Sequence, residues 1–518
     1  MPRPAPHITI IGAGIGGLAS ALRLSHAGAK VTVLERHAGP GGKMRTVPSA
    51  AGPVDAGPTV LTMKAVFEAL FSDVGARLQD HVTLQREEIL ARHFWQDGTT
   101  LDLMSDPTGS RKNVQSVFGS TAAKEFTRFS EKARALFTAF DAPMMQSPAP
   151  TLGAMTANVL KKPSLIPAMA PHLSLAKLLK QQFSEPRLAQ LFARYATYVG
   201  GLPAASPAIL SLIWHAECNG VWYVKGGMHQ LATAIEALAK DFGAEFRYNN
   251  HVDWIESNGD TVRSVHTSQG VLHTDAVLFN GDPRALNKVS LGASVCNAVP
   301  RQEPRSLSAY VHAFAAQAQG LELAAHNVFF ADDPASEYDP LADGRMQPDP
   351  TLYVCAQDRF CDRRPTGPER FEIIMNAAPT ADDTPDEKER LQCLTLISKR
   401  LGQFGLTFSP PPGPETLTMP QDFAQMFPAS TGSLYGRSPH GLMAAFKRPT
   451  ARTKIKGLYL TGGGAHPGAG VPMATLSAQH AAAAITTDLN LTSTSRRAAT
   501  RGGMSTASPM TVRAPSRS

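Results

Sequence analysis

The chain has 518 residues, with 50 Lys and Arg against 43 Asp and Glu, and 43% of its residues are hydrophobic. At roughly 150 residues per domain, this length excludes one simple domain, and 42 Gly with 40 Pro are too few for a collagenous or low-complexity chain. The net charge of +7 suits a nucleic-acid or anionic-membrane partner, so its distribution along the chain has to decide between them.

The cysteines argue against a disulfide framework and against a zinc site, because their number is odd and no CxxC pair occurs. They are Cys218, Cys296, Cys355, Cys361 and Cys393. We expect reduced thiols in a cytoplasmic protein. Residues 1–7 hold three prolines and leave no room for a secretory signal. No uninterrupted run of about 18 apolar residues predicts a spanning helix, although a helix lying on a membrane surface remains compatible with the sequence.

The first elements predict a dinucleotide-binding fold. Residues 7–11 are a short β-rich run, residues 12–17 (GAGIGG) form a glycine loop, and residues 18–26 follow a helical pattern. Residues 29–34 give a second buried-strand pattern that ends at Glu35. This β-α-β layout with a terminal acid is typical of the Rossmann fingerprint.

Each glycine of the loop has an expected task. Gly12 permits the tight turn, Gly14 lets the backbone approach a pyrophosphate, and Gly17 lets the helix pack against the strand. Glu35 follows Gly12 by 23 residues, where a carboxylate can accept hydrogen bonds from a ribose diol. An acid at this position disfavours a 2′-phosphate, which leaves NAD or FAD.

A second glycine loop favours FAD. Residues 39–45 (GPGGKMR) resemble the extended phosphate-binding region of FAD-dependent amine oxidases and desaturases. In this loop Lys43 and Arg45 can face phosphate or flavin carbonyl groups. Far along the chain, residues 457–464 give another strand and glycine loop, and residues 473–485 a helix whose N-terminus can stabilise a reduced flavin.

The segments between these ends complete the predicted organisation. We expect a helix over 230–241, strands over 244–248 and 252–256, and an antiparallel hairpin over 261–265 and 270–278. The expected fold class is α/β: an FAD-binding Rossmann-type domain of the amine oxidase and GDI kind, with an interleaved α+β substrate domain and a helical membrane-associating region. The expected FAD domain comprises residues 1–104, 221–289 and 449–488, and the expected substrate domain comprises residues 105–220 and 290–448.

The motifs together resemble the carotenoid desaturases of the phytoene desaturase family. They are GAGIGGLASALRL, GPGGKMR, VDAGPTVLT, GVWYVKGGMHQLATAIEAL, LFNGDP and LYLTGGGAHPGAGVPMATLSAQ, and they run in the family's order from residue 8 to about residue 485. HNVFFADDP at 326–334 and LYVCAQDR at 352–359 resemble the purple-bacterial branch of 1-hydroxycarotenoid 3,4-desaturases. Phytoene desaturase and other carotenoid desaturases or isomerases are the alternatives within the family.

The resemblance implies a set of FAD-binding positions. They are Gly12, Ala13, Gly14, Ile15, Gly16, Gly17, Glu35, Arg36, Gly42, Lys43, Met44, Arg45, Gly57, Pro58, Thr59, Val252, Asp282, Gly463, Gly464, Val471, Pro472 and Met473. Lys225 stands where the family commonly has arginine, which keeps the charge but removes bidentate recognition. The implied reaction removes a hydride and a proton from adjacent carbons, with the flavin as hydride acceptor.

No catalytic acid or base is assigned from the sequence, and no metal is expected. Candidates near the predicted domain junction are Tyr195, Tyr198, His215, Glu217 and Trp222, although residues of these types more often have a core or packing role than a catalytic one. A membrane quinone or oxygen is the expected electron acceptor. The more distant alternatives are a flavin amine oxidase, with a small soluble amine as substrate, and a non-catalytic lipid escort of the GDI type, without flavin.

A carotenoid dissolves in the bilayer, so we expect the enzyme to lie peripherally on the inner (photosynthetic) membrane. Residues 142–184 contain no Asp or Glu but four lysines, and Leu175, Leu178 and Leu179 share one helical face between Lys177 and Lys180. The alternative is a core helix with a solvated lysine edge. Five arginines without an acid supply most of the net charge from residues 490–518, so residues 489–518 are expected to be a disordered basic tail. The remainder is nearly neutral and does not favour nucleic acid.

Overall fold

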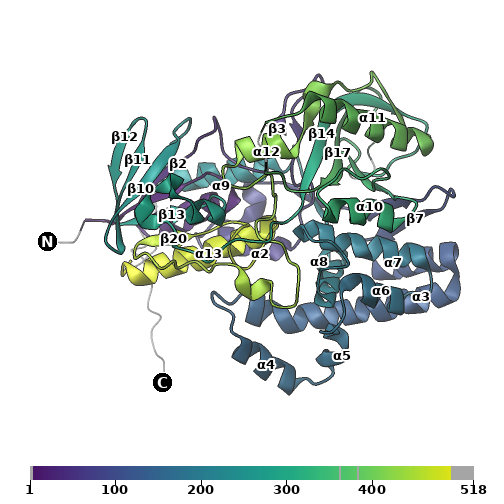
Figure 1. Ribbon diagram of the computed structural model, residues 1–518, viewed down its shortest axis with the longest axis horizontal. Helices are drawn as coiled ribbons and strands as arrows, with labels where there is room; N and C mark the ends of the chain where they lie inside the picture. Colours follow the sequence, from purple (N-terminus) through teal and green to yellow (C-terminus); the bar gives the residue numbers. More distant parts are fainter. Residues whose placement is uncertain (1–3, 361–362, 364, 382–383, 492–518) are drawn as a thin grey trace, which may run out of the picture.

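A parallel sheet with its helices lies beside a larger mixed sheet, and a group of helices lies below the mixed sheet (Figure 1). This arrangement is taken from a computed structural model that describes residues 4–360, 363, 365–381 and 384–491. Most of the predicted tail, and Cys361, therefore lie outside the described residues. The four other cysteines are free thiols.

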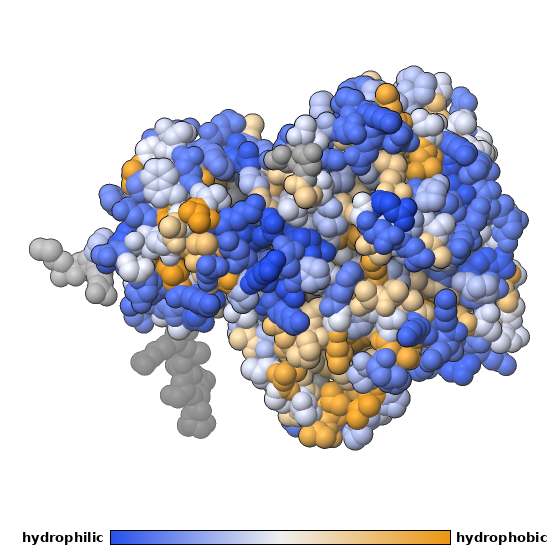
Figure 2. All heavy atoms as spheres, viewed as in Figure 1, coloured by the Kyte–Doolittle hydropathy of each residue, from blue (hydrophilic) through white to orange (hydrophobic). Residues whose placement is uncertain are grey.

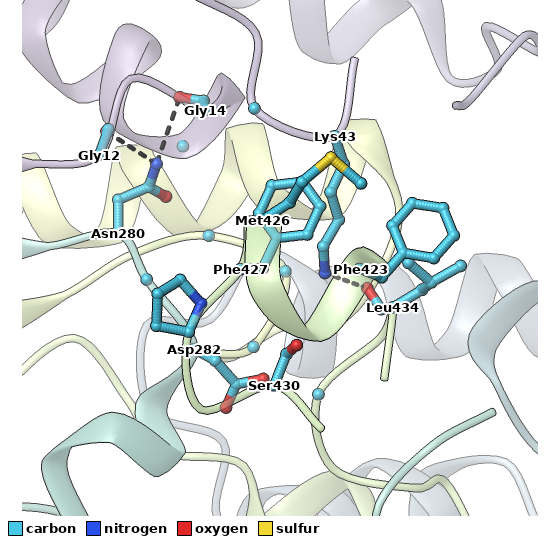
Figure 3. A pocket seen from close by; sticks show the side chains of 18 of the residues that line it. Gly12, Gly14, Lys43, Asn280, Asp282, Phe423, Met426, Phe427, Ser430 and Leu434 are labelled. Atoms are coloured by element: carbon cyan, nitrogen blue, oxygen red, sulfur yellow. Dashed lines mark hydrogen bonds between the residues drawn. The ribbon is translucent and has the colours of Figure 1, made fainter. Parts of the chain in front are cut away.

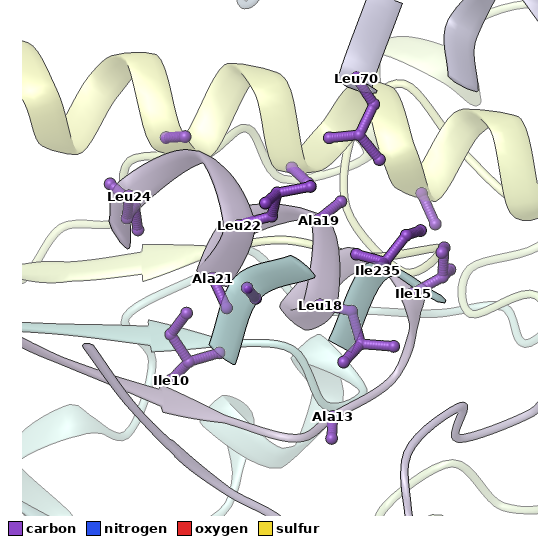
Figure 4. Packing of buried hydrophobic residues seen from close by; sticks show 14 of the residues in the cluster. Ile10, Ala13, Ile15, Leu18, Ala19, Ala21, Leu22, Leu24, Leu70 and Ile235 are labelled. Carbon is purple, nitrogen blue, oxygen red and sulfur yellow. The ribbon is translucent and has the colours of Figure 1, made fainter. Parts of the chain in front are cut away.

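The parallel sheet has five strands in the order β20-β13-β1-β2-β9. Its strands are β1 (His7–Ile11), β2 (Lys30–Leu34), β9 (Glu245–Arg247), β13 (Ala276–Phe279) and β20 (Leu458–Leu460). Helices α1 (Ile15–His26), α9 (His229–Asp241) and α13 (Val471–Asp488) pack together around it. Figure 4 shows Leu18 and Leu22 of α1 within this core, which also contains Ile10 of β1 and Ile235 of α9. The central strands are apolar because a doubly covered parallel sheet is buried on both faces.

The predicted hairpin over 261–278 is only partly correct. The strands β10 (Val252–Asn258), β11 (Thr261–Thr267) and β12 (Gly270–His273) do form an antiparallel sheet. Strand β13, however, leaves the hairpin and pairs in parallel with β1, Ala276 lying opposite Ile8. The four residues of β13 are all buried, which a half-solvated hairpin strand cannot provide.

The mixed sheet has eight strands and one face covered by helix α11 (Glu387–Gln403). Its strands are β6 (Ile89–Phe94), β7 (Thr100–Met104), β14 (Ser308–Gln319), β15 (His326–Phe329), β16 (Leu352–Ala356), β17 (Glu369–Ala377), β18 (Thr407–Ser409) and β19 (Leu417–Thr418). Strand β6 pairs in parallel with β15, so it joins this sheet although it precedes residue 104. The sequence pattern of β6 and β7 does not reveal the partner strand, which is more than 200 residues away.

The helical part begins with α3 (Pro107–Phe140), which is interrupted at Gly119, where φ is 89°. Asp106 caps its start by accepting hydrogen bonds from the amides of Thr108 and Gly109. The following helices are α4 (Leu152–Lys161), α5 (Leu165–Met169), α6 (Leu175–Gln182), α7 (Pro186–Ala193) and α8 (Ile213–Cys218). Aromatic rings from α3, α7 and α8 pack against one another in tilted arrangements and form the core of this part.

Helix α6 does not offer its apolar face to a membrane. Leu175 and Leu179 are fully buried in the helical core, whereas the exposed residues of the helix are polar: Lys177, Lys180 and Gln181. The alternative of a core helix with a solvated lysine edge is therefore correct. The exposed apolar residues of this region lie instead on α4 and α5, where Leu152, Leu160 and Ile166 are 54%, 70% and 49% exposed.

The remaining elements connect these layers. They are β3 (Thr46–Val47), β4 (Val54–Asp55), α2 (Lys64–Ser72), β5 (Leu84–Arg86), β8 (Trp222–Val224), α10 (Pro334–Ala342) and α12 (Pro420–Met426). Met63, which directly precedes helix α2, has a left-handed backbone with φ 51°. Within the described residues, no helix combines the length and apolar character needed to cross a membrane.

Candidate active site

A cavity of about 540 Å³ lies at the carboxyl ends of the parallel strands, where α/β folds bind their ligands (Figure 3). Strands β1, β2 and β13 each contribute their last residue to its wall: Ile11, Leu34 and Phe279. The mixed sheet contributes Ala309 and Val311 of β14 and Ile374 of β17. The cavity is thus shared between the two layers that the sequence assigns to cofactor and substrate.

Asn280, which the sequence pattern did not assign to the site, fixes the shape of the first glycine loop. The side-chain amide of Asn280 donates hydrogen bonds to the carbonyls of Gly12 (3.0 Å) and Gly14 (3.3 Å), as Figure 3 shows. Gly12 needs its positive φ of 99°, and a Cβ on Gly17 would lie 2.1 Å from the Gly12 carbonyl oxygen. The first N–H groups of α1 therefore remain free to meet an anion.

Two backbone amides of the protein hold the Glu35 carboxylate in place. Its two carboxylate oxygens accept hydrogen bonds from the backbone amides of Ala13 (2.7 Å) and His37 (2.9 Å), and the side chain is buried. Such bonds to a charged acceptor hold the carboxylate in one orientation. Glu35 lines the cavity, so its remaining lone pairs can accept hydrogen bonds from a ribose diol.

The part of the cavity around Lys43 and Asp282 carries an excess of positive charge. Lys43 donates a hydrogen bond to the Leu434 carbonyl (2.5 Å), and burial lowers its pKa to about 8 while Asp282 opposes that shift (Figure 3). Asp282 forms an ion pair with Arg305. Arg448 donates to the Gly463 carbonyl at 2.8 Å, and burial lowers the pKa of this group as well. Three cations around one carboxylate favour an anionic or electron-rich ligand.

A strap formed by α12 and the residues after it closes one side of the cavity. Phe423, Met426 and Phe427 line the cavity from this strap. Two bonds tie it to the loop after Glu35: Arg36 donates to the Gln425 carbonyl (3.2 Å), and the His37 ring contacts the Met426 carbonyl (3.0 Å). The strap therefore excludes water from the region that Glu35 serves, and the sequence pattern did not reveal it.

The second glycine loop places a helix start at the cavity. Helix α13 begins at Val471 after Gly470, which has φ 107° and no side chain to cap the helix. Gly463 and Gly464 line the cavity next to it. The uncapped N–H groups of α13 are thus directed at the same ligand as those of α1.

Most of the predicted FAD-binding positions line this cavity. They are Gly12, Gly14, Ile15, Gly16, Glu35, Arg36, Gly42, Lys43, Met44, Gly57, Pro58, Val252, Asp282, Gly463, Gly464 and Val471. The predicted positions outside its lining are Ala13, Gly17, Arg45, Thr59, Pro472 and Met473. Ala13 and Gly17 lie behind the loop and support its shape. Arg45 turns away, donating to the Thr418 hydroxyl (2.6 Å).

The five candidates at the domain junction do not form one group. Tyr195, Tyr198 and Glu217 come together: the Tyr195 hydroxyl donates to Glu217 (2.9 Å), and Arg194 donates to the Tyr198 hydroxyl (2.6 Å). Burial raises the pKa of Glu217, which Arg194 opposes. His215 lies apart against Phe137, and the Trp222 ring contacts the Lys64 ammonium at 4.5 Å. Lys225 is exposed and does not line the cavity.

The residues present fit FAD. The glycine loops leave a cradle in which a Cβ on Gly42 would lie 3.0 Å from the Gly14 Cα, so the two loops enclose the space that a pyrophosphate needs. Glu35 lies at one end for a ribose and the cationic group at the other. Within the described residues, no cluster of His, Cys, Asp and Glu is arranged to hold a metal ion.

Comparison with known proteins places this architecture in a family. Residues 15–486 match the flavin containing amine oxidoreductase family. The chain is 51% identical to the hydroxyneurosporene desaturase of Cereibacter sphaeroides over 492 residues, which cover 94% of this chain and 99% of that protein. It is 46% identical to the protein of the same name from Rhodobacter capsulatus, covering 94% and 99% of the two chains.

Solved structures share the fold at low sequence identity. Putrescine oxidase bound to putrescine matches with a TM-score of 0.59 at 14% identity, covering 94% of this chain and all of that chain. Cyclohexylamine oxidase from Brevibacterium oxydans matches with a TM-score of 0.54 at 18% identity, covering 94% and 100%. The matches confirm the predicted FAD cofactor and the resemblance to the desaturases. The chain belongs to the flavin containing amine oxidoreductase family and, within it, groups with the hydroxyneurosporene desaturases.

Proposed function

We propose that the chain is a FAD-dependent carotenoid desaturase that introduces the C-3,4 double bond into 1-hydroxy carotenoids. The observation that carries this proposal is the 51% identity with a hydroxyneurosporene desaturase over nearly the full length of both chains. The cavity supports it, because its lining joins a dinucleotide site to an apolar sheet face formed by Ala309, Val311 and Ile374. An amine would need polar or charged partners that this face does not offer.

In the proposed reaction, two neighbouring carbons lose a hydride and a proton and gain a double bond. Bound FAD supplies the hydride acceptor. The chain contributes positioning and electrostatics: Lys43 and Arg448 stabilise negative charge at one end of the cavity, and the strap excludes water. We propose a membrane quinone or oxygen as the final electron acceptor.

We further propose that the enzyme is cytoplasmic and lies peripherally on the inner membrane through the α4–α5 patch, meaning Leu152, Leu160 and Ile166. These large apolar side chains are exposed together with Lys161 and Lys162 beside them, a combination suited to an anionic lipid surface. Figure 2 shows hydrophobic residues gathered where Figure 1 places α4 and α5. A patch of this kind gives a bilayer-dissolved substrate access to the protein.

We also propose an FAD domain and a substrate domain that divide near residue 88 rather than residue 104. The support is the pairing of β6 with β15, which assigns β6 and β7 to the substrate sheet. The FAD domain then comprises three separate segments, as the sequence indicates.

The catalytic proposal is tested with purified, FAD-loaded protein and liposomes that contain 1-hydroxyneurosporene or phytoene. We expect the polyene absorption of 1-hydroxyneurosporene to shift to longer wavelength and that of phytoene to stay unchanged. Reaction of phytoene alone would refute the proposed substrate, and a protein purified without flavin absorbance would favour the lipid-escort alternative.

The membrane proposal is tested by co-sedimentation with anionic liposomes. Replacing Leu152, Leu160 and Ile166 with serine should move most of the protein to the supernatant, because each change removes about 1.5–3 kcal/mol of apolar burial. A matched triple variant, in which the exposed Val271, Val289 and Leu391 become serine elsewhere on the surface, serves as control. Equal partitioning of both variants would refute the assignment to α4 and α5.

A further inference from the structure

A hydrogen-bonded chain of three side chains lies next to the cavity, on the inner face of the mixed sheet. The Tyr353 hydroxyl contacts the Thr59 hydroxyl at 2.8 Å and the Nδ1 atom of His326 at 2.7 Å. Tyr353 is on β16 and His326 on β15, whereas Thr59 belongs to the GPT turn of the FAD domain. These hydrogen bonds therefore connect the two layers that enclose the cavity.

The position of this chain follows from the register of the sheet and from the turn. Tyr353 is the partner of Ile374 across the strands, and Ile374 lines the cavity. Thr59 directly follows Pro58, which also lines the cavity. Thr59 and Tyr353 are thus each one position away from a residue that lines the cavity.

The Tyr353 side chain is only partly buried. Strands flank Tyr353 on both sides and the α11 layer covers the opposite face of the sheet, yet the side chain keeps part of its surface accessible. Tyr353 and the cavity-lining Ile374 are cross-strand partners, so their side chains lie on the same face of the sheet. Burial raises the pKa of Tyr353 well above its ordinary value, so its hydroxyl stays protonated.

The direction of the hydrogen bonds leaves one donor unused. Burial lowers the pKa of His326 to about 4, so the imidazole is neutral, and its Nε2 atom has no partner among the described residues. A buried N–H without an acceptor is rarer than a bare lone pair, which places the proton on Nδ1. Nδ1–H then donates to Tyr353, and Tyr353 donates to Thr59. The Thr59 O–H can therefore donate a hydrogen bond to another acceptor. The neighbouring Cys355 thiol does not fill this role well, because sulfur is a weak acceptor.

We propose that Thr59 and Tyr353, backed by His326, bind the tertiary hydroxyl group of the 1-hydroxy carotenoid and so select hydroxylated end groups. This inference rests on the proposed function. In a 1-hydroxy carotenoid a single carbon separates the hydroxyl-bearing carbon from the 3,4 bond, so the hydroxyl must lie close to the reacting atoms. Thr59 follows Pro58 and Tyr353 pairs with Ile374, and both of these neighbours line the cavity, so the two hydroxyls are polar groups next to an apolar part of the lining.

The test compares the binding of 1-hydroxyneurosporene and of neurosporene, a hydrocarbon carotenoid without the hydroxyl. Dissociation constants are measured in liposomes by quenching of protein fluorescence, under anaerobic conditions and with the bound FAD reduced beforehand, so that no hydride can be transferred. We expect the wild type to bind the hydroxylated carotenoid about fivefold to tenfold more tightly. Y353F and T59V should reduce that ratio to about one, and T59S should restore it.

The control is Y310F, because Tyr310 lies on the opposite face of the same sheet and its hydroxyl contacts Glu389. This variant should keep the wild-type ratio, and flavin content and thermal unfolding check that each variant is folded. A wild-type ratio of one, or a ratio unchanged in folded Y353F and T59V, would overturn the proposal. Absence of turnover with 1-hydroxyneurosporene would instead refute the proposed function, because the binding ratio does not require turnover.

Discussion

The close packing of helix α1 on the first glycine loop makes Gly17→Ala an informative perturbation. The added Cβ would lie 2.1 Å from the Gly12 carbonyl oxygen, so the backbone must move by about 0.9 Å to restore the usual minimum contact of 3.0 Å. Such overpacking costs about 1–3 kcal/mol, whereas the higher helix propensity of alanine returns at most about 1 kcal/mol. With the full ~1 kcal/mol returned, we therefore expect a net loss of about 0–2 kcal/mol in the free energy of unfolding.

The effect on FAD affinity should be larger, because the same shift misaligns the first N–H groups of α1. Loss of one hydrogen bond to a charged phosphate costs about 1.5–3 kcal/mol, which raises the dissociation constant of FAD tenfold to a hundredfold. The assay is titration of the FAD-free protein, followed by flavin fluorescence, with thermal unfolding measured in parallel. Gly39→Ala is the control, since its Cβ meets no atom within 4 Å. A Gly17→Ala variant that binds FAD within twofold of the wild type would refute the reasoning.

Three further predictions follow from charged or polar side chains. N280A should weaken FAD binding about tenfold by removing both bonds to the glycine loop, whereas N287A, which removes one bond to a carbonyl elsewhere, should not; equal titration curves would contradict this. Lys43 has a pKa of about 8 in the folded state against 10.5 ordinarily, so the unfolded chain holds more protons between those values and stability should rise from about pH 8 to 10.5. In urea unfolding of the FAD-free protein, K43M should lack this rise. A K43M stability that rises with pH as steeply as that of the wild type would refute the prediction. Burial raises the pKa of Glu372, so its carboxyl should lower stability as pH rises above 4.5, and the stability of E372Q relative to the wild type should increase as pH rises above 4.5 in the same assay; a constant difference would count against a destabilising buried carboxyl.

The cofactor half of the fold was predictable because its signals are local. The β1–α1–β2 unit ends on Glu35, and both its glycine loop and its strand lengths can be recognised within about thirty residues. The loop before α13 repeats the same strand, glycine and helix order. These elements depend on backbone requirements that few residue types satisfy.

The remaining features depend on contacts between distant segments. Nothing near β13 in the sequence shows that it leaves its hairpin to pair with β1, and nothing near β6 shows its pairing with β15. The amphipathic pattern of α6 was visible, but the pattern alone does not tell whether a protein core or a lipid surface covers its apolar face. The role of Asn280 becomes apparent only when β13 is placed beside the glycine loop.

The order in which the strands of the parallel sheet occur along the chain has a consequence for biosynthesis. Strand β20 and helix α13, which complete the sheet and cover α1, come from residues 458–488, after more than 400 residues have already been made. A nascent chain on the ribosome thus exposes the apolar side of α1 until synthesis is nearly finished, and it lacks the second glycine loop during that time. FAD incorporation must therefore follow translation, and the unfinished chain requires protection from aggregation over most of its synthesis.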